Sequence, residues 1–319
     1  MAARPYIAAP VVAAFAPEAG AVPFPGYRLI RLRGRGGFAT VWEASDPNGD
    51  RVAMKFMSSA NSANTSRELR SLQTIQAVTH PNLLKIRQVW SVPGQIVIAM
   101  DLADASLLDL VELYITEFGR LIEPEKLGLY MYQVAQALDF LNTRRHRIDG
   151  KLVGLQHGDI KPNNILLVGD SAQLADYGLA TPTTGPVTPC PRQGTAEYCA
   201  PEVFQGNLSD RSDQFSFAVT YYVLRTGTFP YPPPPSKRES LKNYVRPDPD
   251  VSALPPAEQA ILLRSLSPIP QMRHASCLDL MSGLLTAQGL RASRNDEGAI
   301  FIEPIPLEAP DPPKSKLFK

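Results

Sequence analysis

Residues 157–180 read HGDIKPNNILLVGDSAQLADYGLA, and the rest of the chain is best interpreted outward from them. The stretch holds two acidic groups and one amide at unequal spacings, Asp159, Asn164 and Asp176. After the amide, the apolar run 165–168 and the Gly-Asp pair that follows it predict a tight hairpin. A hairpin returns Asp176 to the neighbourhood of Asn164. Carboxylate and amide oxygens that meet there suit Mg²⁺.

The spacing D-x-K-x-x-N, followed by D-Y-G, resembles the catalytic and metal-binding loops of protein kinases. The resemblance implies that Asp159 accepts the proton of a substrate hydroxyl and that Lys161 neutralises charge on the transferring phosphoryl group. It also implies that Asn164 and Asp176 hold Mg²⁺, or Mn²⁺ in its place, against the phosphates of ATP. The triplet HGD also resembles the aminoglycoside phosphotransferases, which are small-molecule kinases of related fold, but these carry a His where this chain has Lys161.

A glycine-rich stretch lies between two strand-like runs within residues 27–45. Its glycines are Gly34, Gly36 and Gly37, and Ala39 stands where the pattern G-x-G-x-x-G has its third glycine. The period-2 pattern predicts strand, loop and strand, whereas a dinucleotide-binding fingerprint needs its glycines to open a helix. The kinase resemblance implies a loop that covers the phosphates of ATP. A flexible hairpin tip is the alternative interpretation.

Lys55 lies in the middle of a predicted strand among apolar neighbours, where a charge is costly unless a partner meets it. The helical spacing of residues 66–72 contains Glu68, and the resemblance assigns Glu68 as the carboxylate that orients Lys55 toward the α and β phosphates. Without that resemblance, an edge-strand lysine and a solvated helix-face glutamate are the ordinary interpretations.

Residues 95–103 read as a buried strand that runs into a linker, and the resemblance places the adenine of ATP there. Met100 then stands at the back of the pocket, although a core methionine describes it equally well. Ser106 opens a helix and either reaches the ribose or acts only as a helix-start residue. The ATP contacts that the resemblance implies are Gly34, Gly36, Gly37, Ala39, Val41, Ala53, Lys55, Glu68, Met100, Asp101, Ala103 and Ser106.

Residues 194–202, GTAEYCAPE, resemble the end of the activation segment of Ser/Thr kinases. The resemblance implies that Thr195 is hydrogen-bonded to Asp159 and Lys161, so that these three residues form the catalytic set. Small-molecule phosphotransferases lack this motif. It also implies a buried, structural ion pair between Glu202 and Arg273, which lies near the carboxyl end of the match.

Gly158 stands where most regulated protein kinases carry an arginine that binds an activating phosphate. A phosphate on the activation segment therefore finds one cation fewer and orders the segment less. We expect activity to depend little on such phosphorylation. The candidate autophosphorylation sites in this segment are Thr183, Thr184 and Thr188.

Two helices and one loop form the expected scaffold of the larger lobe. Residues 124–142 carry an apolar stripe at helical spacing, and residues 212–227 are apolar nearly all round, which predicts a buried helix that ends at Gly227. Asp213 caps this second helix, and in the family it holds the backbone of the catalytic loop. The basic residues after position 143 read as a solvated hairpin with a turn at Gly150.

The composition excludes several classes of protein. The chain has 319 residues, 44% of them hydrophobic, and a formal net charge of +1, so it can bury a large core but has no general field for nucleic acid. Prolines interrupt the apolar amino end, so we expect no membrane span in the chain. The three cysteines have no metal-ligand spacing, which indicates a reducing compartment and a cytoplasmic protein.

These observations together predict an α+β, two-lobed protein-kinase fold, with a β-rich small lobe that has one main helix and a larger helical lobe. The predicted divisions are a disordered Ala/Pro-rich tail at 1–25, a small lobe and linker at 26–103, a large lobe at 104–288, and a Pro-rich tail or linker at 289–319. The implied function is an ATP-dependent Ser/Thr kinase acting on protein hydroxyls. A pseudokinase scaffold is the main alternative, but it predicts loss of Lys55, Asp159 or Asp176, and all three are present.

Overall fold

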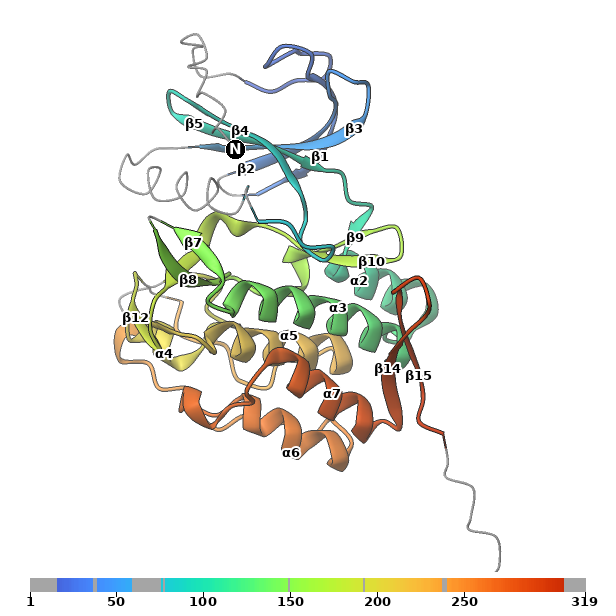
Figure 1. The fold of residues 1–319 in the computed structure, drawn as a ribbon, viewed down its shortest axis with the longest axis vertical. Coiled ribbons are helices and arrows are strands. Elements are labelled where there is room, and N and C mark those ends of the chain that lie inside the picture. The colour runs from blue at the N-terminus through green and yellow to red at the C-terminus, as the bar shows by residue number, and fades with distance from the viewer. Residues whose placement is uncertain are drawn as a thin grey trace, which may run out of the picture.

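The structure, a computed structural model, describes residues 16–36, 39–58, 76, 78–148, 150–191, 193–236 and 240–306. Two lobes lie one above the other, with the strands of the small lobe over the helices of the large one (Figure 1). This arrangement confirms the predicted two-lobed α+β class. Gly37 and Glu68 lie outside the described residues, so the roles assigned to them stay predictions.

The small lobe is a five-stranded antiparallel sheet in the order β1-β2-β3-β5-β4. In β3, apolar residues flank Lys55, which pairs with Val41 on one side and with Ile98 on the other. Strand β3 is thus a central strand, and Lys55 is not the edge-strand lysine of the alternative interpretation. The strands are β1 (Arg28–Arg35), β2 (Ala39–Ser45), β3 (Arg51–Ser58), β4 (Ile86–Val92) and β5 (Gln95–Asp101).

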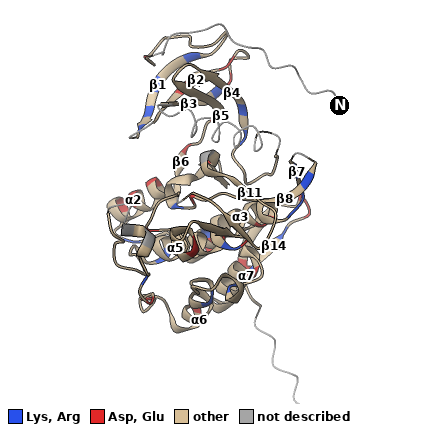
Figure 2. Cartoon of the chain, turned by 90° about the vertical axis from the view of Figure 1, so that its left-hand side faces the viewer, with Lys and Arg blue, Asp and Glu red and all other residues tan. Residues whose placement is uncertain are grey.

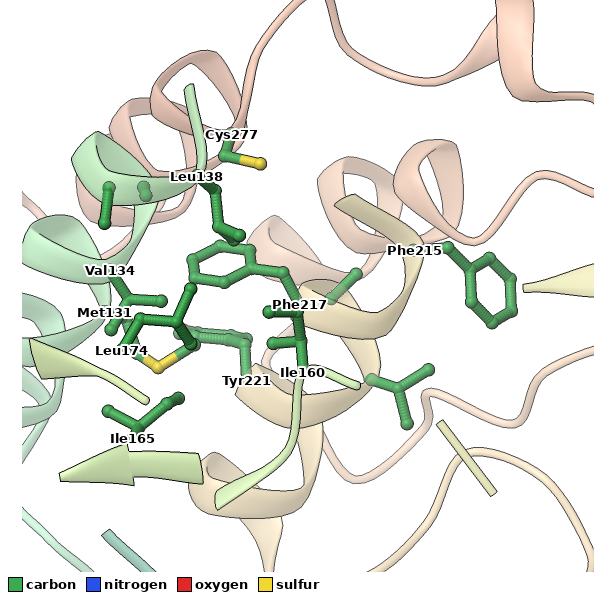
Figure 3. Packing of buried hydrophobic residues seen from close by; sticks show 14 of the residues in the cluster. Met131, Val134, Leu138, Ile160, Ile165, Leu174, Phe215, Phe217, Tyr221 and Cys277 are labelled. Atoms are coloured by element: carbon green, nitrogen blue, oxygen red, sulfur yellow. The ribbon is translucent and has the colours of Figure 1, made fainter. Parts of the chain in front are cut away.

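The large lobe is built on helices that pack around one apolar core. The described helices are α2 (Leu107–Phe118), α3 (Pro124–Asn142), α4 (Pro201–Phe204), α5 (Ser212–Thr226), α6 (Pro256–Ser265) and α7 (Cys277–Ala287). Met131 and Leu138 of α3 meet Phe217 and Tyr221 of α5 and Cys277 of α7 in the middle of this core (Figure 3). The predicted apolar stripe of α3 and the predicted buried helix α5 are therefore confirmed.

The large lobe also contains short strands and 3₁₀ turns between its helices. The predicted hairpin after Asn164 is present as β9 (Ile165–Val168) and β10 (Ser171–Leu174). The predicted hairpin is present as β7 (His146–Ile148) and β8 (Lys151–Gln156), but the prediction that it is solvated is wrong for the second half of β8, where residues 153–156 are buried. The other short elements are β6 (Ala105–Ser106), β11 (Thr181–Thr183), β12 (Val187–Pro189), β13 (Asn207–Ser209), η1 (Pro162–Asn164), η2 (Tyr177–Leu179), η3 (Ser240–Asn243) and η4 (Pro270–Met272).

The predicted tail at the amino end is wrong for residues 16–25. Gly20 donates to the carbonyl of Leu29 at 2.8 Å, and Leu29 donates back to Ala21 at 2.8 Å. The Phe24 ring stacks on Trp90 with centroids 4.1 Å apart and planes inclined by 7°. The segment is ordered because it covers apolar residues on the outer face of the sheet.

The predicted tail after residue 288 is also wrong for its first part. Residues 290–304 form the antiparallel hairpin of β14 (Leu290–Arg294) and β15 (Ile300–Pro304), which lies beside α3 (Figure 1). A Cβ atom on Gly128 of α3 would stand 2.8 Å from Leu285 of α7 and 3.8 Å from Ile302 of β15, so the three elements pack closely. Leu290 of the hairpin is buried and Ile302 packs against the core, whereas the prolines that suggest a tail begin only at Pro304.

Candidate active site

Asp213 on α5 holds the loop that carries the predicted catalytic residues. Its carboxylate accepts hydrogen bonds from the backbone N–H groups of His157 at 2.6 Å and Gly158 at 2.9 Å. The His157 ring in turn contacts the carbonyl of Ala175 at 2.8 Å. Complete burial raises the pKa of Asp213, although the two backbone donors and His157 act in the opposite direction. The loop is thus fixed from a core helix, as the resemblance implied.

Asp159 lies at the centre of a network that joins the three predicted catalytic residues. Its Oδ1 accepts from the backbone N–H of Thr195 at 2.9 Å and from the Thr195 hydroxyl at 2.8 Å. Its Oδ2 is paired with Lys161 Nζ at 2.8 Å, and the same Nζ donates to the Thr195 hydroxyl at 2.7 Å. The carboxylate therefore has a fixed direction beside a cation.

The β9–β10 hairpin brings the two predicted metal ligands together. Asn164 ends the 3₁₀ turn before β9, and its carbonyl accepts from the backbone N–H of Ala175 at 2.8 Å, one residue before Asp176. Its side-chain Nδ2 donates to the Asp159 carbonyl at 2.8 Å and to Asp159 Oδ2 at 3.0 Å. The amide oxygen of Asn164 consequently faces away from Asp159.

Lys55 reaches across from the small lobe to Asp176, with its Nζ 2.8 Å from Oδ1 of the carboxylate. Burial acts to raise the pKa of Asp176, but the charge and hydrogen bond of Lys55, with His157 and Lys161, outweigh it and hold this pKa below its usual value. Asp176 has φ of 67°, in the left-handed region, and it is the one non-glycine residue with positive φ in the described part of the chain. The carboxylate is therefore ionised and held at a strained backbone position.

A cavity of about 740 Å³ lies between the lobes. All the predicted ATP contacts that fall within the described residues line it, as do both predicted metal ligands and Lys161. They are Gly34, Gly36, Ala39, Val41, Ala53, Lys55, Met100, Asp101, Ala103, Ser106, Asn164 and Asp176. The predicted ATP contacts and metal ligands thus gather on one cavity, although they come from both lobes, whereas Asp159 and Thr195 are not among its lining residues and join it through Lys161.

Two predicted ATP contacts have additional structural partners. The buried Ser106 caps α2, because its hydroxyl accepts from the backbone N–H of Asp109 at 3.1 Å and donates to the Asp109 carboxylate at 2.8 Å. The Asp101 carboxylate accepts from Arg87 Nε at 2.7 Å. This hydrogen bond raises the pKa of Arg87. The helix-start interpretation of Ser106 is therefore confirmed, and its hydroxyl lies on the cavity wall.

Several residues of the cavity wall were missed by the sequence analysis. Arg33 donates from β1 to the carbonyls of Ala103 at 3.4 Å and Asp104 at 3.2 Å, and so joins the small lobe to the linker. Nothing in the local sequence distinguishes Arg33 from the other arginines of β1. Tyr177 follows Asp176, and its hydroxyl donates to the carbonyl of Leu174. Burial raises the pKa of Tyr177 well above its usual value, so the ring belongs to the core.

Glu202 and Arg273 form the buried pair that the resemblance implied. Two parallel contacts of 2.8 Å join the guanidinium to the two carboxylate oxygens. Ser212 donates to the same carboxylate at 2.8 Å. Burial would raise the pKa of Glu202, but Arg273 and Ser212 hold it below the usual value. The pair ties the end of the segment 194–202 to Arg273, and neither residue is among those that line the cavity.

The activation segment is ordered on both sides of its midpoint. Strand β11 pairs with β8, and β12 pairs with β13. Thr183 is 1% exposed, which contradicts its prediction as an accessible autophosphorylation site in this conformation. It is buried because β11 lies on β8 at Gly154, where a Cβ would stand 3.1 Å from the Thr183 hydroxyl. Thr184 is exposed and Thr188 is partly exposed.

Known proteins share both the sequence pattern and this arrangement. Residues 27–293 match the family model described as protein kinase domain. The chain is 30% identical over 277 residues to the Ser/Thr-protein kinase PknD of Mycobacterium tuberculosis, with 83% of this chain and 40% of the relative covered. It is 30% identical over 306 residues to PknH of the same organism, with 91% of this chain and 46% of the relative covered.

A solved structure gives the same result. The PknI kinase domain of Mycobacterium tuberculosis superposes with a TM-score of 0.64 at 25% identity, and the match covers 85% of this chain and 100% of that one. The chain therefore belongs to the protein kinase family, in the bacterial eukaryotic-like Ser/Thr group. It spans less than half the length of the curated relatives PknD and PknH.

Membrane-spanning helices and clusters of metal-binding side chains are both absent from the described residues. No helix among them is long and apolar enough to cross a bilayer. The same part of the chain contains no group of three or more His, Cys, Asp and Glu that could hold a metal ion. Positions of basic and of acidic residues both occur along the ribbon of the two lobes (Figure 2).

Proposed function

We propose that this protein kinase domain transfers the γ-phosphate of ATP to serine and threonine hydroxyls of proteins. The observation that carries the proposal is the network of Asp159, Lys161 and Thr195. Thr195 binds both the Asp159 carboxylate and Lys161, so it connects these two residues directly to the segment 194–202. Family membership supports the protein kinase class, and this network supports the choice of hydroxyl.

Asp159 acts by orientation and by accepting the proton of the incoming hydroxyl. Thr195 and Asn164 fix the carboxylate through both its oxygens, so little reorganisation is needed when a substrate arrives. Lys161 stands 2.8 Å from the same carboxylate, and its charge is placed to stabilise a transferring phosphoryl group. No covalent intermediate on the protein is required.

The cavity between the lobes is the ATP site in this proposal. Ala53 and Met100 give it an apolar wall for a base, and Gly34 and Gly36 let the backbone approach phosphates closely. Lys55 supplies a cation for the α and β phosphates. The contact of Lys55 with Asp176 joins this side chain of the small lobe to a proposed metal ligand of the large lobe.

The residues present fit a magnesium ion. Asp176 supplies an ionised carboxylate, Asn164 supplies an amide oxygen that faces away from Asp159, and Mg²⁺ is usually held by one or two protein oxygens, phosphates and water. Mn²⁺ accepts the same ligands. When bound, the ion neutralises charge on the phosphates of ATP. Asp176 and Asn164 then hold it at the end of the hairpin.

The proposal extends to two further properties. Thr184 and Thr188 are the accessible candidates for autophosphorylation in the activation segment, whereas Thr183 is not. All three cysteines are buried thiols, which supports a reducing, cytoplasmic setting for the domain. The substrates of the whole protein are proteins with accessible Ser or Thr hydroxyls.

The test is transfer of radioactive phosphate from γ-labelled ATP to myelin basic protein and to the chain itself, with Mg²⁺ and again with excess EDTA. We expect label to enter protein with Mg²⁺ and not with EDTA, and Mn²⁺ to restore it. Thermal stabilisation by ATP and Mg²⁺ is measured on the same protein. Nucleotide binding without any label transfer would favour the pseudokinase scaffold instead.

A further inference from the structure

Arg246 makes an unusual set of contacts below the substrate side of the active site. It lies between η3 and α6 in a segment without helix or strand. Its Nη2 donates to the carbonyls of Ala196 at 2.6 Å, Glu197 at 3.0 Å and Cys199 at 2.8 Å, and its Nε donates to Cys199 at 3.1 Å. One side chain therefore binds three carbonyls of a single turn.

The guanidinium is enclosed by aromatic rings. Its central carbon lies 4.7 Å from the ring centre of Tyr231, 5.2 Å from that of Phe204 and 5.6 Å from that of Phe215. Arg273 lies 5.1 Å from the same Phe215 ring, which points away from the core around Phe217 (Figure 3). Cation–π contacts of this kind fix a guanidinium in place as well as stabilise its charge.

The charge of Arg246 has no direct acidic partner. Burial lowers the pKa of Arg246, and the salt bridges found within the described residues do not include it. Its Nη1 is buried without a hydrogen-bond partner in that part of the chain. Arg273, by contrast, is neutralised by Glu202 at 2.8 Å. The Arg246 guanidinium is thus held by backbone carbonyls and aromatic rings, and an apolar side chain at this position would leave those carbonyls without its donors.

The turn that Arg246 holds begins at the catalytic network. The backbone N–H groups of Tyr198 and Cys199 donate to the carbonyl of Thr195 at 3.0 Å and 3.1 Å. Thr195 itself is bound to Asp159. Asp159 thus holds the first residue of the turn 195–199, and Arg246 holds the carbonyls that follow it, at 196, 197 and 199.

Residues 195–198 of this turn are partly exposed. Tyr198 packs edge-on against Phe229 with centroids 5.3 Å apart, and Phe229 is 43% exposed. We propose that Arg246 is a positioning residue, which holds the turn 195–199 as the surface where the substrate backbone lies beside Asp159. This inference rests on the proposed function, because it needs a protein substrate at this turn.

The test compares Arg246→Lys and Arg246→Gln with the unaltered protein. Arg225→Lys is the matched control, because Arg225 is also a partly buried arginine of the large lobe but pairs with Glu258 at 3.2 Å, away from the turn. Steady-state kinetics give kcat and KM separately for myelin basic protein and for ATP. Thermal midpoints are recorded with and without ATP and Mg²⁺.

We expect both Arg246 variants to lose about tenfold or more in kcat/KM for the protein substrate, mainly through KM, while KM for ATP changes less than about twofold. Arg225→Lys should leave both KM values unchanged. An unchanged KM for the protein substrate would overturn the inference, as would equal losses for protein and ATP. If both variants fail to fold while Arg225→Lys folds, Arg246 serves stability and the inference is wrong. Absence of transfer by the unaltered protein would instead overturn the proposed function, and with it this role.

Discussion

Asp159 is the residue on which the proposed chemistry depends most. Replacement by Asn keeps the side-chain shape but removes the charge and the capacity to accept a proton. We predict that Asp159→Asn lowers phosphate transfer by about 10²-fold to 10⁴-fold, the usual contribution of a general base, and leaves the fold intact. Asp170→Asn, in the exposed turn of the β9–β10 hairpin, is the control and should be unaffected. Undiminished transfer by Asp159→Asn would refute its assignment.

Asp176 differs from Asp159 because its carboxylate pairs with Lys55 and lies on the cavity wall. We predict that Asp176→Asn lowers transfer by orders of magnitude and also weakens ATP binding in the presence of Mg²⁺. Thermal shift with ATP alone and with ATP and Mg²⁺ separates the two effects. The variant should lose the additional stabilisation that Mg²⁺ gives, and retention of it would show that the metal is held elsewhere.

Gly158 has φ of 80°, and a Cβ there would stand 3.0 Å from Gln193 Nε2 and 3.3 Å from the Leu179 carbonyl. We predict that Gly158→Ala lowers the free energy of unfolding by about 1–2 kcal/mol for the left-handed backbone, plus a contact cost. Gly169→Ala is the matched control, because Gly169 has φ of 56° with nothing within 4 Å of its Cβ position. Urea denaturation measures both, and equal losses would show that the neighbours of Gly158 yield without cost.

Among the elements, the activation segment is held by strand pairing on both sides of its midpoint. The catalytic loop has Gly158 where an arginine would bind a phosphate on this segment. We predict that phosphatase treatment and a Thr183/Thr184/Thr188 triple-alanine variant each change transfer to an exogenous substrate by less than about tenfold. Because Thr183 is buried, a Thr184/Thr188 double-alanine variant separates loss of phosphate from loss of packing. A tenfold drop in this double variant, about 1.4 kcal/mol of transition-state stabilisation, would contradict the prediction.

The hairpins show why some elements are predictable from sequence and others are not. The β9–β10 hairpin has an apolar run, a Gly-Asp turn and a second short run, so local chemistry specifies it. The β14–β15 hairpin also has turn residues at 295–298 and an apolar run at 300–302, but the Pro-rich residues from Pro304 onward led to the prediction of a tail, and its stability comes from packing on α3 and α7 that the sequence does not show. Residues 16–25 were missed for the same reason, since Phe24 is ordered by its contact with the distant Trp90.

The site follows the same rule. Residues recognised by motif, such as Lys55 and Asp176, gather on the cavity. Arg33 and Arg246 act through carbonyls of distant segments, at Ala103 and Ala196 among others, and no sequence pattern marks such contacts. The contact of Lys55 with Asp176 across the lobes is a second example, while the predicted partner Glu68 lies outside the described residues.

At the scale of the whole molecule, the Glu202–Arg273 pair joins the activation segment to the far end of the domain. We predict that Glu202→Gln lowers the free energy of unfolding by about 3–5 kcal/mol near neutral pH, because a buried arginine loses its charge partner. The pKa of Glu202 is lowered by folding, so the stabilisation is present above the unfolded value of 4.5 and is lost as pH falls through the lower folded value.

Urea denaturation of the unaltered protein and of Glu202→Gln at a series of pH values tests this direction of the pH dependence. The difference between the unaltered protein and Glu202→Gln should stay constant from about pH 5 to pH 8 and shrink below about pH 4.5, where Glu202 of the unfolded chain begins to take up a proton while the folded protein keeps it ionised. A difference that grows as pH falls would contradict the assigned direction of the shift.

The central claim is that the domain phosphorylates alcohol hydroxyls of proteins through Asp159, Lys161 and Thr195. Phosphoamino-acid analysis tests it most directly, after incubation of the domain with γ-labelled ATP, Mg²⁺ and myelin basic protein. The account predicts label on phosphoserine and phosphothreonine and none on phosphotyrosine, with the label absent for Asp159→Asn. Label mainly on phosphotyrosine, or no label in protein at all, would contradict it.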